Sequence, residues 1–498
     1  MPHKSLKAMA KTMKNHVSLL EALRGVSMKI ELQTSRQKLL SFIKRSITLL
    51  AHFGLAAILV LAPSMNVAQA QSQSVPIIRD AEIEQLLYDY TTPIFKAAGI
   101  KNKIQIIIVN DQSFNAFVDG QRMFVNIGAL MQAETPNEII GVIAHETGHL
   151  ANGHQQRLRE QIKRAQTMAV IGMLLGIGAG VAGATTGNSA AAGAGGGIAA
   201  GSNEIAMRTL LNYQRSEEAA ADRAAVNYLN ATGQSTKGML ITFERFSSAL
   251  ALSGAKVDPY RVSHPLPRER IAALETLAKQ NPYYDKKDSP ELQLRHDMAR
   301  AKIAAYTDHF TELRRMFKDN PRGLPARYGE AILAVESGSP KNAVEKVKDL
   351  IKDEPKNPYF LELLGDALIK ANDPAGAANA YKRSAELDPR GSSLLRVSYG
   401  HALLLTNDPK NVPLAITEIR AGIAKEPEFA AGYGYLALAY GRSGQVALAD
   451  LATADMHYYS GNRMQARIFA TRAQQKLARG SAEWLRAQDI LNTTQLKK

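Results

Sequence analysis

Cysteine is absent from this sequence of 498 residues, and tryptophan occurs once. The absence of cysteine excludes disulfide-bonded scaffolds, thiol catalysis and cysteine-ligated zinc. Any metal ion must therefore be bound by His, Asp and Glu side chains. Negative charge is also scarce, with 61 Lys and Arg residues against 46 Asp and Glu residues. Ten of the basic residues but two of the acidic ones lie within residues 1–70, so the rest of the chain lacks a dense basic arm and nucleic-acid binding is not expected.

Residues 1–70 have the pattern of a secretory signal with a long basic leader. Lys44 and Arg45 precede the apolar run SITLLAHFGLAAILVLA, and an Ala-x-Ala site ends at Ala70. This order predicts export with cleavage after Ala70, and a periplasmic location, soluble or peripheral to a membrane. An uncleaved anchor is the alternative, because the apolar run is at the lower length limit for a bilayer span. Translation starting at Met28 would shorten the leader.

Residues 71–285 mix helical and strand patterns. Residues 103–110 are rich in Ile and Val and predict a strand. Residues 115–131 predict a hairpin that turns at Asp119-Gly120, and the next helix is expected to begin at Thr135-Pro136. The segment therefore predicts an α+β domain, mostly helical with a small β-hairpin sheet.

Residues 168–201 consist almost entirely of small and apolar residues, with many glycines. A helix followed by a mobile loop over the cleft is the favoured interpretation, because the apolar part is barely long enough to cross a bilayer. A membrane-spanning helix is the alternative. A third, intermediate possibility is that this segment contacts a membrane peripherally or contacts a membrane-protein substrate.

Residues 286–498 contain a repeat of about 34 residues, the period of tetratricopeptide repeats. Turns that contain a proline recur, and Leu364-Gly365, Ala377 and Tyr381 occupy consensus positions of the third repeat. The prolines are Pro321, Pro355, Pro389 and Pro427. The pattern predicts an all-α solenoid, whose concave surface commonly binds protein segments.

The stretch GVIAHETGHLANGH, residues 141–154, contains candidate catalytic and metal-binding residues. On a helix, His145 and His149 are about 40° apart and project from one face, whereas Glu146 is turned by about 100°. Two histidines can thus bind one metal ion while Glu146 lies beside a bound water as general base. The alternative is two histidines that happen to lie on a helix.

A second helix, in YQRSEEAAADRAAVNYL, offers a third ligand. Glu218 and Asp222 are four residues apart and therefore lie on one face. Glu218 can complete a His₂Glu zinc site with a fourth position for water, and Asp222 can accept the free ring N–H of a ligand histidine. The alternative is a solvated charged face that includes Glu217.

Two more histidines need an interpretation. His154 lies nine residues after His145, on the opposite side of a continuous helix, so we expect it to be structural and to face away from the metal. His264 precedes two prolines in SHPLPRER, which can present its side chain rigidly. It could stabilise an oxyanion, occupy the open zinc position and keep the enzyme latent, or be an incidental loop residue.

HETGH, EEAAAD, HPLPRER and the earlier NAFVDG together resemble the CAAX-prenyl-protease/HtpX-like zinc metallopeptidases. The export signal and the repeats narrow the resemblance to periplasmic BepA-type proteases of Gram-negative bacteria. The resemblance implies a zincin-like (gluzincin) fold with one Zn²⁺ held by His145, His149 and Glu218, and Glu146 as the catalytic base. It also implies quality control of misfolded or unassembled envelope proteins, in particular outer-membrane β-barrels, with the repeats contacting their assembly machinery.

The predicted hairpin gives this substrate class a physical basis, because an exposed strand can bind an extended peptide as an additional strand. The competing hypothesis is a periplasmic chaperone or adaptor that works through the repeats and whose protease site is mostly latent.

Overall fold

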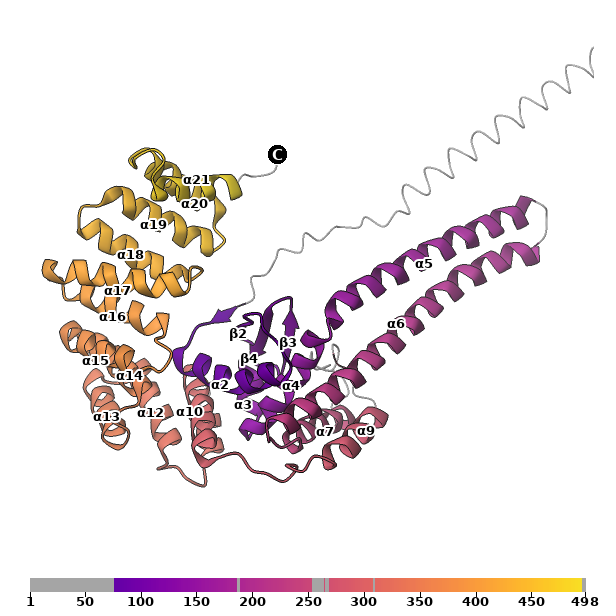
Figure 1. Ribbon diagram of the computed structural model, residues 1–498, viewed down its shortest axis with the longest axis horizontal. Helices are drawn as coiled ribbons and strands as arrows, with labels where there is room; N and C mark the ends of the chain where they lie inside the picture. Colours follow the sequence, from indigo (N-terminus) through magenta and orange to yellow (C-terminus); the bar gives the residue numbers. More distant parts are fainter. Residues whose placement is uncertain (1–75, 186–188, 253–263, 265–267, 308–309, 495–498) are drawn as a thin grey trace, which may run out of the picture. The chain divides into compact units, whose positions relative to one another are not determined.

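The computed structural model describes residues 76–185, 189–252, 264, 268–307 and 310–494. The expected export signal and its cleavage position lie outside these residues. A region that contains a small sheet comes first along the chain and an array of paired helices follows (Figure 1). Within the described residues, no helix combines the length and the apolar character that crossing a bilayer requires.

The sheet has four strands in the order β1-β2-β4-β3. These are β1 (Ile77–Ile78), β2 (Gln105–Val109), β3 (Ala116–Asp119) and β4 (Arg122–Asn126). The predicted strand is confirmed, and so is the hairpin as far as Asn126, but residues 127–131, which were predicted as part of the hairpin, are helical. Asp119 pairs with Arg122, so the turn residues are Gly120 and Gln121, one position later than predicted, and Gly120 has a φ of 61° that favours glycine. Among the strands of the described residues, β3 lies at the edge of the sheet and pairs with β4 alone.

Six helices pack with this sheet or near it. They are α2 (Ala81–Ala97), α3 (Ile127–Gln132), α4 (Pro136–Ala151), α6 (Ser189–Ala231), α7 (Lys237–Leu252) and α9 (Arg268–Lys279). As predicted, Pro136 opens α4, with Thr135 as its N-cap residue. Every residue from Pro136 to His149 is buried, so α4 runs through the core and its polar side chains must find partners inside the protein.

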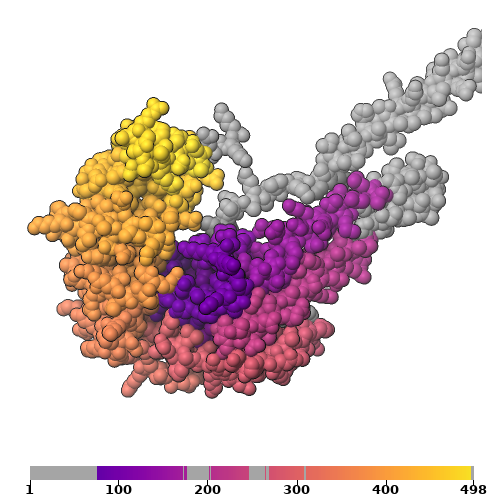
Figure 2. All heavy atoms as spheres, viewed as in Figure 1, coloured from indigo at the N-terminus to yellow at the C-terminus, as the bar shows by residue number. Residues whose placement is uncertain are grey.

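A long helical hairpin occupies the Gly/Ala-rich region. α5 (His154–Thr185) and α6 lie side by side (Figure 1). The mobile loop expected within residues 168–201 is thus wrong for residues 189–201, which are helical. Alanine has the highest helix propensity, and in this segment it outweighs the cost of the glycines. Figure 2 shows both helices at the surface, and apolar side chains such as Leu174 and Ile205 are about 60% exposed.

The helical array begins with α10 (Pro290–Tyr306) and α11 (Phe310–Met316). Helix pairs follow: α12 (Leu324–Ser337) and α13 (Pro340–Asp353), α14 (Pro358–Lys370) and α15 (Pro374–Leu387), α16 (Ser393–Leu405) and α17 (Val412–Lys425), α18 (Ala430–Arg442) and α19 (Val446–Tyr459), α20 (Arg463–Gln474) and α21 (Ala482–Thr493). Each of the four recurring prolines lies between one pair and the next or before the first. A Cβ on Gly365 would lie 2.6 Å from the ring of Tyr381, which explains the small and aromatic consensus positions.

The array and the first region share a core. Ala299 and Ile303 of α10 belong to the same cluster of buried apolar residues as Leu86 of α2 and Ile143 of α4. The first helix of the array is therefore packed against the region that carries the HETGH motif.

Candidate metal centre

α4 presents His145 and His149 on one face, as their spacing predicts. The two Nε2 atoms are 3.1 Å apart, and the residues are 0% and 8% exposed. Gly148, between them in sequence, explains how α6 comes close enough to contribute. A Cβ at this position would lie 2.9 Å from the carbonyl oxygen of Ala221, so a larger residue would push the two helices apart.

α6 brings Glu218 to both histidines. Its carboxylate oxygens lie 3.3 Å from the Nε2 of His145 and 3.3 Å from the Nε2 of His149. His264 completes the group, with its Nδ1 3.1 Å from Glu218 and 3.3 Å from the Nε2 of His145. One donor atom from each of these four residues lies within 4.8 Å of the others. The helices that carry His145 and Glu218, about 70 residues apart in sequence, therefore meet as predicted.

The donor set fits zinc. Imidazole nitrogens and a carboxylate oxygen are ordinary zinc ligands, and four of them suit tetrahedral coordination. Three imidazoles and a carboxylate converge here in a buried place where water cannot easily satisfy them. His145, His149, Glu218 and His264 thus form a candidate zinc site.

The electrostatics also favour a cation at this point. Burial alone would lower the pKa of His145, but Asp222 and Glu218 outweigh it and raise that pKa to about 9. For Glu218, burial raises the pKa, yet the three histidines outweigh burial and lower it. For His149, burial lowers the pKa to about 4, which leaves the neutral imidazole that a metal requires. A divalent ion would take the place of the proton that the carboxylates stabilise on His145.

Asp222 lies behind the centre, as predicted. Its Oδ1 is 3.0 Å from the Nδ1 of His145 and so fixes the ring from its outer side. The sequence interpretation missed its partner, Arg270 of α9, which donates to both carboxylate oxygens of Asp222 at 2.7 and 2.8 Å. The Nη1 of Arg270 also lies 2.7 Å from Glu218. Arg270 is the last residue of the stretch HPLPRER, but nothing in that stretch indicates that Arg270 pairs with Asp222.

The prediction that His154 faces away from the metal is wrong. Its Nδ1 lies 2.9 Å from the Nδ1 of His149, and its Nε2 lies 2.8 Å from Glu217. The predicted angle assumed one continuous helix, but α4 ends at Ala151 and Gly153 adopts a φ of 64° before α5 begins at His154. This break turns His154 back onto the outer nitrogen of His149.

Glu146 lies beside the donors, next to a cavity of about 360 Å³. It is 1% exposed, and its Oε1 lies 3.4 Å from the Nε2 of His264. Burial raises the pKa of Glu146. Phe117 and Val118 of the edge strand β3 line the same cavity, together with Tyr213 of α6. The cavity thus joins a carboxylate, a candidate metal site and the edge strand β3.

Comparisons with known proteins agree with this geometry. Residues 78–278 match the model of peptidase family M48. The putative beta-barrel assembly-enhancing protease of Vibrio cholerae is 26% identical over 306 residues, which cover 58% of this chain and 60% of that protein. The beta-barrel assembly-enhancing protease of Escherichia coli K12 is 23% identical over 342 residues, 68% of either chain. The match therefore spans about two thirds or less of these relatives.

Among solved structures, MamA is 20% identical and covers 33% of this chain and 91% of its own, with a TM-score of 0.26. YrrB, described as a TPR protein, is 16% identical and covers 36% of this chain and 91% of its own, with a TM-score of 0.28. The family match and the converging donors agree on the same segment: residues 78–278 are similar to peptidase family M48, whose metalloproteases depend on zinc.

Proposed function

We propose that this chain is an exported zinc endopeptidase that cleaves misfolded or unassembled outer-membrane β-barrel proteins. The observation that carries the proposal is the convergence of His145, His149 and Glu218 beside Glu146, in a cavity that an edge strand borders. The names of the relatives support the substrate class, since they describe proteases that enhance β-barrel assembly.

In this proposal His145, His149 and Glu218 hold Zn²⁺, and Asp222 orients His145 from behind. Zn²⁺ held by these residues would supply Lewis-acid chemistry toward the scissile carbonyl group and the water. The carboxylate of Glu146 accepts a proton from the water that attacks the carbonyl carbon. It then gives this proton to the leaving amide nitrogen as the C–N bond breaks, so that Glu146 returns to its starting state.

β3 positions the substrate. An extended segment can pair its backbone with the unpaired side of β3, which places its peptide groups along the cavity. Pairing of this kind depends on the main chain of the substrate more than on its side chains. An unassembled β-barrel protein, with unpaired strands, offers many such segments.

A Glu146→Gln variant tests the activity. Gln keeps the volume but cannot accept the proton, so we expect cleavage of an unfolded β-barrel protein to slow by about 10²–10⁴-fold. Zinc content, measured by atomic absorption, should stay at one ion per chain. The matched control is Glu160→Gln on the exposed face of α5, which should cleave like the unaltered chain. Rapid cleavage by the Glu146→Gln protein with zinc bound would rule out this base.

A second candidate, a chaperone or adaptor with a latent protease site, is favoured by one observation. His264 lies among the metal donors, where it could fill the position that water needs. A His264→Ala variant separates the roles: activity rises if His264 blocks the site and falls if it stabilises the oxyanion. In cells that lack the chain, full rescue of envelope defects by Glu146→Gln would show that the binding role dominates.

The proposal also includes two contacts beyond the active site. The helical array would contact the β-barrel assembly machinery, and the α5–α6 hairpin would touch a membrane surface peripherally. Leu174, Met168 and Ile205 are each more than half exposed on this hairpin. Leu174→Glu should weaken flotation with anionic vesicles, whereas Leu438→Glu, at an exposed leucine of α18, should not.

A further inference from the structure

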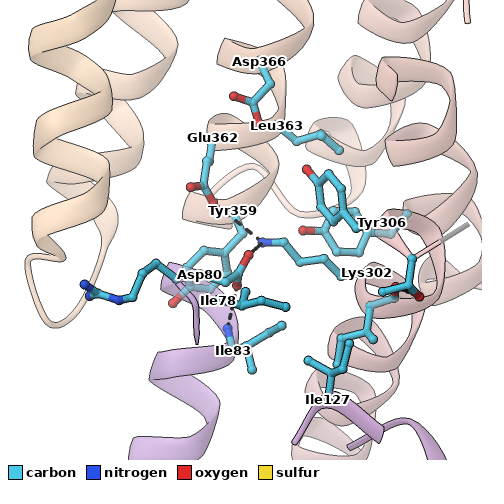
Figure 3. A pocket seen from close by; sticks show the side chains of 14 residues that line it. Ile78, Asp80, Ile83, Ile127, Lys302, Tyr306, Tyr359, Glu362, Leu363 and Asp366 are labelled. Atoms are coloured by element: carbon cyan, nitrogen blue, oxygen red, sulfur yellow. Dashed lines mark hydrogen bonds and ion pairs between the residues drawn. The ribbon is translucent and has the colours of Figure 1, made fainter. Parts of the chain in front are cut away.

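A second buried polar group, far from the metal centre in sequence, lies where β1 and α2 meet α10, α12 and α14. It surrounds a cavity of about 310 Å³, large enough for a small ligand or a long side chain. Figure 3 shows Lys302 of α10 reaching toward Asp80, with Glu362 and Asp366 of α14 close by. We call Asp80, Glu82, Lys302, Glu362 and Asp366 the junction cluster.

Negative groups outnumber positive ones in the junction cluster. The Nζ of Lys302 lies 2.7 Å from Asp80, 3.2 Å from Glu82 and 3.8 Å from Glu362, and its side chain is 6% exposed. Asp366 is the fourth carboxylate of the cluster and lines the cavity. Three carboxylates thus share one buried ammonium group, while Asp366 accepts a hydrogen bond from the hydroxyl of Tyr381.

Among the described residues that line the cavity, no other cation is available to balance them. Arg79 also lines the cavity, but its guanidinium group pairs with Glu84 and Glu426 instead. The lack of a second cation affects the two acidic residues of α14, Glu362 and Asp366. Burial outweighs the attraction of Lys302 and raises the pKa of Glu362, and burial also raises the pKa of Asp366 to about 6. Both carboxylates would be stabilised by a second positive charge.

The geometry excludes a small metal ion and favours an organic cation. Within the part of the chain that the structure describes, the only acidic or histidine group that converges for a metal is the one at His145. Three of the junction carboxylates line a cavity that Tyr306 and Tyr359 also line. Tyr306 is 47% exposed at the cavity, and the ring of Tyr359 already has the Nζ of Lys302 5.9 Å from its centre. Aromatic faces and separated carboxylates are the surroundings that alkylammonium groups prefer.

We propose that the junction cavity binds a primary ammonium group, with Glu362 and Asp366 as its carboxylate partners and Tyr306 beside its alkyl stem. Two sources carry this chemistry: the lysine side chain of a polypeptide and a free polyamine. The site is independent of the peptidase chemistry and lies against the repeats.

The test is isothermal titration of the whole exported chain at low salt with two probes. One is spermidine, and the other is a short blocked peptide with a central lysine. We expect saturable binding to one site, and acetylation of the peptide's lysine should weaken binding about tenfold or more, since it removes the charge. Tighter binding of the peptide identifies a polypeptide source, and tighter binding of spermidine identifies a polyamine.

Variants locate the site. Glu362→Gln and Asp366→Asn should each weaken binding of the preferred probe about fivefold or more, because each removes one charged partner. Glu330→Gln is the matched control, since Glu330 is exposed on α12 and pairs with Lys346. Circular dichroism establishes that the variants are folded. If the unaltered chain binds neither probe, or if the two cavity variants bind like the control, the junction cluster is only an ionic network and the proposal is wrong.

Discussion

The metal centre is buried and the junction cluster is partly buried, and both are charged and assembled from segments far apart in sequence. They differ in how their groups are arranged. At the metal centre, four donors converge within 4.8 Å, and Arg270 and Asp222 hold them from behind. At the junction, three carboxylates contact one lysine, and among the described residues they do not form a mutually close group of donors like that at the metal centre. Convergence of donors, more than the number of charges, therefore distinguishes a metal site from an ionic network.

The comparison implies that each cluster depends on a different cation. The junction depends on the ammonium group of Lys302, which is part of the chain. The metal centre depends on an ion that must be supplied. Substitutions and metal additions should therefore act on the two clusters separately, because among the described residues the ion pairs of each cluster stay within that cluster.

The largest expected effect is that of Lys302→Met. Methionine fills a similar volume but leaves Asp80, Glu82 and Glu362 without their cation, so the free energy of unfolding should fall by about 3–5 kcal/mol. Urea unfolding measures this loss. Adding Glu82→Gln should restore part of it, and Lys346→Met, at an exposed ion pair, should change little. An unchanged stability in Lys302→Met would mean that the junction charges are solvated, contrary to the comparison.

Zinc should stabilise the chain through the metal centre alone. At a free zinc concentration 100 times the dissociation constant, the free energy of unfolding should rise by about 2.7 kcal/mol. Calorimetry with and without zinc should show that Glu218→Gln loses most of this gain, whereas Glu362→Gln keeps it. Should Glu218→Gln respond to zinc as fully as the unaltered chain, Glu218 is not a ligand.

Asp222→Asn should have a smaller effect, because Asp222 acts through His145. Loss of the outer carboxylate typically weakens zinc binding about 10–100-fold, and Arg270 loses a charged partner as well. Competition with a chromogenic chelator measures the affinity. Asp89→Asn is a matched control, since Asp89 pairs with Arg295 outside the site. An affinity like that of the control would show that Asp222 only holds α9 in place.

The sequence predicted the metal centre better than its surroundings. Helical spacing alone places His145 with His149 and Glu218 with Asp222, because side chains four residues apart share a face. The contact of His154 could not be predicted, since it depends on a break between α4 and α5. Arg270 was missed for a different reason: its pairing with Asp222 depends on how α9 packs against α6.

The fold shows the same limit. The strands, the start of α4 and the repeat turns follow from local patterns, and the structure confirms them. The junction cluster was not predicted, because Asp80 and Lys302 are more than 200 residues apart and each looks like an ordinary surface charge in its own helix. Only packing of the repeats against α2 makes them buried partners.

The smallest expected effect concerns Asp366, whose pKa is raised to about 6 by burial. The unfolded chain releases this proton near pH 4, so the folded protein loses stability as the pH rises from about 4 to 6. Asp366→Asn removes that cost and keeps an acceptor for the hydroxyl of Tyr381. Urea unfolding should therefore show the variant more stable by roughly 1–2 kcal/mol at pH 8 and no different at pH 3.5. Asp349→Asn, at an exposed pair with Lys352, should show no such gain. A destabilised Asp366→Asn protein at pH 8 would mean that Lys302 compensates all four carboxylates, and the junction would then resemble the balanced charges around Arg270.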